Sequence, residues 1–513
     1  MPVTPTYPGL YLEELPSNAR TITAAPTSVA VFVGYGHPYK TRQPDVAVRI
    51  FSFTEYEREF GGLFASGVFD PNLGHAVNQF FLNGGSVAWV VGVQASYRTN
   101  TGSIIAPDPP PGPTATIGGL VFTGREPSDM VEMRVTIDNV SGTTGDITVT
   151  YGAVMLETYR GVSVDPADAN FVETVLGTAS SPRSALATVA PTPGPAYPAT
   201  MPAGSQPFSM NLPANLATTF SAADFGPVFA ADSSLDKVDI FNILCVPGIA
   251  DRDVQSRALV FAERKLAFMV VDPPPQAIAD GGSPASMETL VGIVPKSTNG
   301  ALYFPYLMTT NPLTGLPMAL PPSGFVAGRY ADTDLRRGVW KAPAGLETQI
   351  ATASGVAPTG QMTNQRQGVL NELGVNCLRT FPDSGTVVFG ARTLVTANDA
   401  FQQWRYVPVR RMALFVEQTL LRNLGWAVFE PNDVPLWDAL RTTVNDFMLG
   451  LFNQGAFQGE APSQAFKVVC DRTTTTQADV DNGIVNIIVA FRPLKPAEFV
   501  IIKIAQLAGQ TPG

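Results

Sequence analysis

The last fifth of the sequence places apolar, strand-like segments close to the C-terminus. Residues 465–470 (AFKVVC) precede a polar, threonine-rich stretch, and two further apolar segments follow at 484–491 and 499–504. A strand at a chain end has no obligatory partner in its own fold, and an uncovered apolar edge aggregates unless another strand pairs with it. The pattern therefore favours a chain that adds a strand to another molecule, as a polymer subunit does.

Length and composition agree with a large protein that meets other protein surfaces. The 513 residues exceed one ordinary core and predict two to four domains. Charged residues make up only 15% of the chain, against about 25% in typical domains. No apolar run is long enough for a transmembrane helix, and the N-terminal MPVTPTYPGL lacks the features of a secretory signal. We therefore expect assembly in the cytosol and no direct membrane insertion.

The composition also argues against several classes of function. A net charge of −10 disfavours contact with nucleic acid, which requires a basic face. Cys245, Cys377 and Cys470 are scattered, so they predict neither a disulfide framework nor a zinc site. His37 and His75 are the only histidines, and no glycine-rich phosphate-binding motif follows a strand. We expect no cofactor and no metal.

A few residues invite a chemical interpretation that the sequence does not favour. Cys245 ends a predicted strand, but a free cysteine in such a place is more often buried than reactive. Asp251 and Asp253 begin a predicted helix, where carboxylates are favoured by the helix dipole. Asp272 ends a strand before three prolines. We interpret these side chains as structural and predict no catalytic residue.

The periodicities predict an α/β (α+β) multidomain protein with an insertion. We expect an extended arm over 1–25, a core over 26–95 and 230–362, and a C-terminal domain over 363–513. Residues 96–229 alternate strictly over 131–137 and again over 147–151, with the turn SGTTGD between, which indicates a β-rich domain. This insertion contains no lysine and has an excess of acidic residues, which suits an outward-facing position. The pattern 238–271 reads as strand, helix and strand, a βαβ unit with parallel strands.

Local patterns predict the individual elements. Strands are expected over 29–34, 50–53, 87–93, 131–137, 147–151, 238–246, 265–271, 302–308, 369–373, 377–380, 387–392, 466–470, 484–491 and 499–504. Helices are expected over 54–60, 74–83, 251–263, 321–330, 409–423 and from 435 onward. The pair Arg336 and Arg337 is expected on a loop.

Several long stretches resemble the contractile tail sheath proteins of phage tails and phage-tail-like injection systems. The C-terminal segment 465–506 carries the strongest resemblance, and PPSGFVAGRYADTDLRRGVWKAPAG (321–345) is nearly as specific. The stretch from Arg392-Thr393 to WRYVPVRR at 404–411, the N-terminal 7–36 and NQFFLNGGSVAWVVGV (78–93) are also similar to the family. Together they cover roughly residues 1–95 and 230–510, which is everything except the insertion.

The resemblance implies a structural subunit that is not an enzyme. Sheath proteins form stacked hexameric rings around an inner tube and contract to drive that tube through a target envelope. The family's partners are further copies of itself, the inner tube protein, and baseplate and terminal cap proteins. The assembly is made in the bacterial cytoplasm and becomes part of a phage tail or tail-like particle, cytosolic or released.

The resemblance also assigns roles to the two ends of the chain. In the family, an N-terminal arm and a C-terminal strand complete the C-terminal α/β domain of neighbouring subunits. The corresponding arm residues here are Tyr7, Leu10, Tyr11 and Leu12. The corresponding strand residues are Phe499, Val500, Ile501, Ile502 and Ile504. A frayed terminus and an ordinary edge strand are the alternatives for these two segments.

The C-terminal domain of the family lies against the inner tube. Basic residues in an otherwise acidic chain are therefore candidates for tube contact, with isolated surface cations as the alternative. These residues are Arg410, Arg411, Arg422, Arg441 and Lys467.

Phage tail and bacterial tail-like device remain open within the family. Outside it, the alternatives are a monomeric scaffold or adhesin, or an α/β enzyme. An enzyme would need a clustered polar site, and a monomer would be expected to have a more charged surface.

Overall fold

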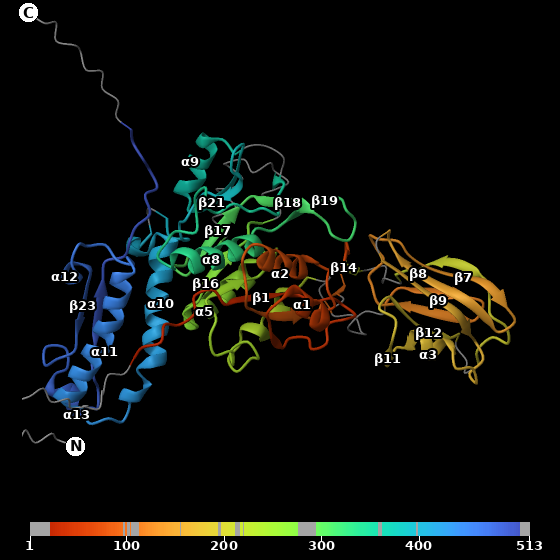
Figure 1. The fold of residues 1–513 in the computed structure, drawn as a ribbon, viewed down its shortest axis with the longest axis horizontal. Helices are drawn as coiled ribbons and strands as arrows, with labels where there is room; N and C mark the ends of the chain where they lie inside the picture. Colours follow the sequence, from red (N-terminus) through yellow and green to blue (C-terminus); the bar gives the residue numbers. More distant parts are fainter. Residues whose placement is uncertain are drawn as a thin grey trace, which may run out of the picture. The chain divides into compact units, whose positions relative to one another are not determined.

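The computed structural model of this chain has two compact units. It describes residues 21–95, 98–99, 103, 112–153, 155–192, 196–210, 216–218, 220–274, 294–357, 362–396 and 399–502. The central unit comprises the described residues of Pro26–Arg411, and the terminal unit comprises those up to Ala25 together with those from Met412 onward. Figure 1 shows the elements of both units.

The central unit is built on one eight-stranded sheet, in the order β2-β3-β1-β15-β16-β17-β21-β22. Every neighbouring pair is parallel except β2 with β3 and β21 with β22. The strands are β1 (Ala30–Tyr35), β2 (Ala47–Ile50), β3 (Ala88–Val93), β15 (Ile243–Cys245), β16 (Phe268–Val271), β17 (Gly300–Phe304), β21 (Val375–Phe381) and β22 (Gly385–Val388). Near-continuous apolar sequences such as AVFVGY suit strands that are covered on both faces, as in parallel sheets.

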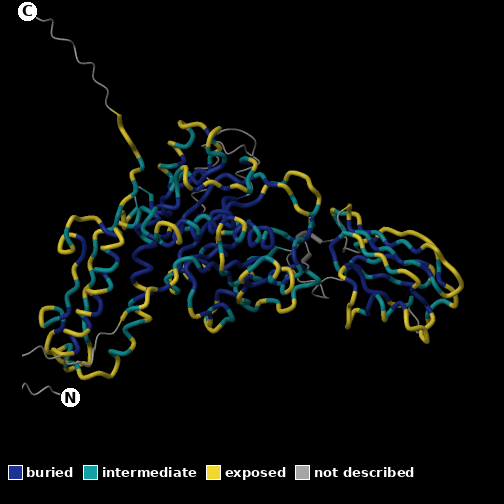
Figure 2. The backbone as a smooth tube through the Cα atoms, in the orientation of Figure 1, coloured by how far each residue is buried: buried dark blue, intermediate teal, exposed yellow. Residues whose placement is uncertain are grey.

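Helices cover both faces of this sheet. On β1, Phe32 packs edge-to-face on Phe80 of α2 (Asn72–Leu82), with ring centroids 5.3 Å apart. The alternate residues Val31 and Val33 join a core that includes Val254 of α5 (Arg252–Arg264). Because successive strand residues point to opposite faces, α2 and α5 lie on opposite sides of the sheet. The dark blue tube of Figure 2 marks this buried interior.

Helix α8 (Ser323–Arg337) packs directly against α2. A Cβ added at Gly324 would lie 2.7 Å from the Cα of Ala76, and one at Gly328 would lie 2.8 Å from the Phe80 carbonyl oxygen. Glycines four residues apart on one helix face allow this close approach. The SGFVAG sequence of α8 therefore encodes a helix contact.

The remaining elements of the central sheet region are short. They are α1 (Phe53–Phe60), β4 (Arg98–Thr99), β14 (Leu216–Thr218), α4 (Ala222–Phe225), η1 (Pro227–Phe229), β18 (Tyr306–Thr310), β19 (Pro317–Leu320), β20 (Gly355–Ala357), α9 (Asn364–Glu372) and η2 (Gln402–Trp404).

The insertion forms its own antiparallel sheets. One has the order β12-β6-β5 and another the order β13-β7-β8-β9, with a shared apolar core from Phe122, Val135 and Val149 among others. The elements are β5 (Thr114–Ile117), β6 (Leu120–Gly124), β7 (Met133–Ser141), β8 (Thr144–Tyr151), β9 (Met155–Ser163), α3 (Val172–Leu176), β10 (Gly177–Thr178), β11 (Ser181–Pro182), β12 (Ala187–Pro191) and β13 (Gly204–Pro207).

A buried charged cluster connects the insertion to the core. Glu126 accepts hydrogen bonds from His37 Nε2, at 2.9 Å, and forms an ion pair with Lys40. Burial, followed by the charges of Lys40 and Arg125, lowers the pKa of His37 well below its usual value. The ring is therefore neutral, with Nδ1 accepting from the backbone N–H of Tyr39.

The terminal unit contains two long helices and a small sheet. Its elements are α10 (Val407–Asn423, which begins in the central unit), η3 (Gly425–Ala427), α11 (Val434–Asn453), α12 (Pro462–Ala465), β23 (Phe466–Val469), α13 (Gln477–Asp481) and β24 (Ile488–Phe491). Leu436, Trp437, Leu440 and Cys470 form its apolar cluster. Thr476 and Asp479 form a capping box at the start of α13, within the threonine-rich stretch.

The structure differs from the expected elements in several places. The expected strand over 302–308 is two strands, β17 and β18, in different sheets, and residues 499–502 form no strand. Residues 364–372 form helix α9 and not a strand over 369–373, and Thr363 caps the helix by accepting from Arg366 N–H. Arg336 and Arg337 lie in the last turn of α8, where cations are favoured, and not on a loop. The two compact units divide the chain at Met412, and β21 pairs with β17 and so extends the central sheet.

Candidate assembly surfaces

The terminal unit presents a two-stranded sheet, β23 with β24. The antiparallel register pairs Phe466 with Phe491 and Val469 with Ile488. Phe457 packs against both aromatic residues, at centroid distances of 6.1 Å and 5.5 Å. Among the strands that the structure describes, none pairs with the outer edge of either strand. A two-stranded sheet is marginally stable by itself in water, so a further strand paired with either edge would stabilise it.

The segment that follows the small sheet is apolar and exposed. Phe499, Val500, Ile501 and Ile502 are 73–81% exposed and belong to no strand of the described chain. Ile504 and the arm residues Tyr7, Leu10, Tyr11 and Leu12 lie outside the described residues. Four consecutive exposed apolar side chains form the kind of surface that marks an interaction site.

The described part of the N-terminal segment is attached to α10. Asn423 forms two hydrogen bonds with Thr23, one to its N–H and one to its carbonyl oxygen, each 2.9 Å long. The hydroxyl of Thr419 accepts from the N–H of Ala25 at 3.1 Å. The sequence analysis did not single out Thr419 or Asn423. The Thr-x-x-x-Asn spacing places two polar side chains on one face of the predicted helix, and this pattern could have indicated that the face binds another segment.

The five basic candidates occupy different environments. Arg422 and Lys467 are exposed, and Arg441 has a side chain that is 42% exposed and forms an ion pair with Asp438 at 2.6 Å. Arg410 is half-buried, donates to Asn299 at 3.0 Å and lies over the ring of Trp404. The side chains of Arg422, Arg441 and Lys467 are thus at least partly exposed to solvent.

Arg411 is buried within the central unit. Its guanidinium donates two hydrogen bonds to Asp334 of α8, at 2.9 Å and 2.6 Å, and one to the carbonyl oxygen of Thr27. It also lies 4.6 Å from the ring centroid of Tyr330, whose hydroxyl is 2.5 Å from that of Tyr303. Because these contacts bury the guanidinium, Arg411 is not on the surface of the subunit and is not a candidate for contact with an inner tube.

The residues that invited a chemical interpretation in the sequence have structural roles. Asp251 caps α5 by accepting from the N–H groups of Asp253 and Val254. Cys245 is buried, and burial raises the pKa of its thiol well above the usual value. A thiol in that state is a poor nucleophile. Within the described residues, no group of three His, Cys, Asp or Glu side chains is arranged to hold a metal ion.

Asp272 is a buried carboxyl at the end of β16. It accepts hydrogen bonds from the N–H and the hydroxyl of Ser323, at 2.7 Å and 2.6 Å, and from Gly248 N–H at 3.0 Å. It thereby satisfies the first N–H group of α8. Burial raises the pKa of this carboxyl to about 6, although these hydrogen bonds lower it.

This raised pKa predicts a pH-dependent stability. The folded chain binds the Asp272 proton more tightly than the unfolded chain, so the contribution is complete below the unfolded value of 3.8 and is lost as pH rises through about 6. Asp272→Asn cannot titrate. As the pH rises from about 4 to about 7, the free energy of unfolding of the Asn variant is therefore expected to increase by roughly 2–3 kcal/mol relative to that of the unsubstituted chain. Urea unfolding across that range measures the difference, and parallel curves would contradict the assignment.

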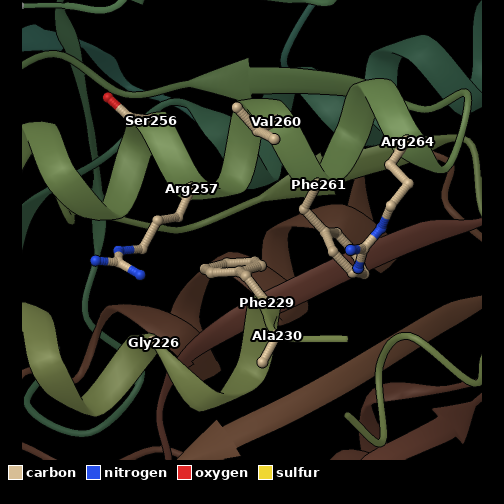
Figure 3. A pocket seen from close by; sticks show the side chains of 8 residues that line it. All are labelled: Gly226, Phe229, Ala230, Ser256, Arg257, Val260, Phe261 and Arg264. Atoms are coloured by element: carbon tan, nitrogen blue, oxygen red, sulfur yellow. The ribbon is translucent and has the colours of Figure 1, made fainter. Parts of the chain in front are cut away.

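The described chain has no helix with the length and apolar character needed to cross a bilayer. A separate feature is a pocket on the surface of the central unit, between α5 and η1 (Figure 3).

Comparison with known proteins supplies the context for these surfaces. The sequence matches the family models for the phage tail sheath protein central domain, over residues 230–394, and the phage tail sheath C-terminal domain, over 399–506. No curated protein matches the sequence.

Solved structures share the fold over nearly the whole chain. A chain of the six-fold symmetrised anti-feeding prophage baseplate is 24% identical, with a TM-score of 0.57 over 98% of this chain and 99% of that one. A chain of the PVC extracellular contractile injection system sheath, in its contracted state, is 22% identical, with a TM-score of 0.59 and 98% of each chain covered. A sheath tail protein from Desulfitobacterium hafniense is 12% identical, with a TM-score of 0.53 over 95% of this chain and 100% of that one.

Proposed function

Because this chain belongs to the phage tail sheath family, we propose that it is the subunit of a contractile sheath in a phage-tail-like injection system. It polymerises as stacked hexameric rings around an inner tube, between a baseplate and a terminal cap. Contraction of the sheath drives the tube through a target envelope. The likeness to chains of the anti-feeding prophage baseplate and the contracted PVC sheath supports this proposal.

The observation that carries the proposal is the incomplete sheet of the terminal unit. The strands β23 and β24 have open outer edges among the described strands, and the apolar segment Phe499–Ile502 is exposed and unpaired there. We infer that this segment pairs with the small sheet of a neighbouring subunit, together with the N-terminal arm. An added strand supplies backbone hydrogen bonds for affinity and alternate side chains for specificity.

Strand addition also suits a sheath that changes shape. Each backbone hydrogen bond contributes only about 0.5–1.5 kcal/mol net, so one added strand is a modest contact. Many such contacts in a lattice give a strong and still deformable connection. The exposed cations Arg422, Arg441 and Lys467 are proposed to face an acidic inner tube, where they would guide docking more than they would strengthen it.

Paired proline and threonine substitutions test the strand exchange. In an extended strand, neighbouring residues direct their backbone N–H groups to opposite edges. The double variant Val500→Pro, Ile501→Pro therefore removes one N–H donor from the edge that pairs, whichever edge that is. This variant is expected to lose tube assembly. The matched variant Val500→Thr, Ile501→Thr keeps both donors and a strand-forming side chain, and it is expected to assemble. Both changes lie at exposed positions, so the soluble subunit should remain folded.

High-speed pelleting and negative-stain electron microscopy give the readout. Hollow, cross-striated tubes from the unsubstituted chain support the sheath function, and a monodisperse particle at every concentration would contradict it. If the proline variant forms tubes as readily as the threonine variant, the strand exchange is wrong while the sheath function stands.

A further inference from the structure

The loop between η3 and α11 carries a fully exposed phenylalanine. Phe429 is 102% exposed and its neighbour Val428 is 62% exposed. Glu430, which follows, and Asp433, which caps α11, are exposed as well. We call Val428, Phe429 and Glu430 the Phe429 knob. It is an apolar tip with acidic side chains beside it.

The backbone of the knob is held in a conformation that its own side chain does not favour. Phe429 has a φ of +69°, which is rare for a bulky residue. Such strain persists only where the surrounding structure enforces it, and it concentrates at functional positions. Here no burial within the subunit offsets it, because the ring is exposed. The conformation instead presents the ring outward.

A pocket in the central unit has the complementary properties. It lies between η1 and α5 and has a volume of about 320 Å³. Figure 3 shows Phe229 and Phe261 in this pocket, with Arg257 toward one end and Arg264 toward the other. Val260, which is 66% exposed, completes the apolar lining. We call this the α5 pocket.

We propose that the Phe429 knob of one subunit inserts into the α5 pocket of a neighbouring subunit. The ring would bury its apolar surface against the exposed Val260 and the small exposed part of Phe229, beside the Arg264 guanidinium that lies over the Phe261 ring. The acidic side chains beside the knob would meet the arginines beside the pocket, which sets orientation and rejects wrong partners. The inference rests on the proposed function, since it concerns contacts between copies.

Two features favour a second copy of this chain as the occupant. Knob and pocket are both present on every copy, and the knob has exposed acidic neighbours where the pocket has a partly exposed arginine at each end. Knob and pocket are also different surfaces, so the contact is heterologous, and repeated heterologous contacts build rings or helical assemblies. Arg257 and Arg264 already pair with Asp253 and Asp236 at 2.8 Å and 3.0 Å, which holds their side chains beside the pocket.

Site-specific cross-linking tests the contact directly. The native cysteines 245, 377 and 470 are buried, so introduced cysteines would react selectively with a short bis-maleimide. Tubes assembled from a mixture of Val428→Cys chains, which keep the Phe429 ring, and Val260→Cys chains are expected to give a cross-linked dimer. The control mixture replaces Val260→Cys with Leu156→Cys, which is also exposed but lies on the insertion. Equal yields in the two mixtures would overturn the proposal.

Phe429→Gly separates assembly from folding. Glycine adopts a positive φ without strain, so the thermal midpoint of the soluble subunit is expected to be unchanged or higher. The minimum concentration for tube formation is expected to rise at least about tenfold, as loss of a buried aromatic contact predicts. If the Phe429→Gly chain forms tubes at the original concentration, the proposed contact is wrong and the proposed sheath function is unaffected. The sheath function is contradicted only if the unsubstituted chain forms no tubes.

A charge exchange completes the test. Glu430→Arg alone is expected to weaken assembly, because it places a third cation against the arginines of the pocket. Combination with Arg257→Gln and Arg264→Gln removes the two cations, leaves Asp253 and Asp236 to pair with the introduced arginine, and is expected to restore assembly. Failure of the exchange to restore any assembly would contradict the proposed orientation.

Discussion

Arg411→Met is expected to destabilise the central unit by about 3–5 kcal/mol. The substitution keeps much of the side-chain volume but leaves the carboxylate of Asp334 buried without its partner. Removal of one member of a buried ion pair costs this much because the remaining charge cannot return to water. Urea unfolding followed by tryptophan fluorescence measures the change.

Two further variants show whether the effect belongs to the ion pair. Arg411→Met combined with Asp334→Leu removes both charges and is expected to recover much of the lost stability. Arg337→Met removes a cation from an exposed pair with Glu347, whose side chains are 54% and 62% exposed, and is expected to change stability by less than about 1 kcal/mol. A small effect of Arg411→Met, similar to that of Arg337→Met, would contradict the assignment.

Gly324→Val is expected to destabilise the same unit by about 3 kcal/mol or more. A Cβ at this position would meet the backbone of Ala76, which cannot move without displacing α2. Overpacking of this kind costs about 1–3 kcal/mol even where side chains can yield, and here the obstacle is backbone. The same unfolding assay applies.

Gly368→Ala is the matched control, with the opposite expected sign. Gly368 lies inside α9, and a Cβ there would have no heavy atom within 4 Å. Alanine in a helix interior is favoured over glycine by about 0.5–1 kcal/mol, so this variant should be more stable. If Gly324→Val were tolerated as well as Gly368→Ala, the close approach of α2 and α8 would not hold the fold together.

Much of the secondary structure of the central unit was predictable from local sequence patterns. The continuous apolar runs that became β1 and β3 indicate strands buried on both faces, and Asp251 marks the start of α5. The family was also predictable, because its resemblance rests on long stretches, and the matched domains cover residues 230–394 and 399–506. These inferences depend on properties of neighbouring residues, which a sequence displays directly.

Local pattern failed where two periodicities compete. The residues VLNEL at 369–373 have apolar side chains at 369, 370 and 373 and were expected to form a strand, yet they lie in or beside α9, of which only Leu370 is buried. A short segment with one buried residue satisfies either period, so the cap at Thr363 and the surrounding packing decide between them.

Only the tertiary structure decided the roles of particular side chains. Arg410 and Arg411 are neighbours with the same charge, but Arg411 reaches Asp334, 77 residues earlier in the chain, and is buried. Phe429 and Phe415 are both apolar residues of the terminal unit, but Phe415 is buried and Phe429 is exposed. The sequence by itself determined the family and many of the strands and helices, because these follow from local order and long motifs. Burial and pairing depend on which distant residues the fold brings together, and a single sequence does not display those distances.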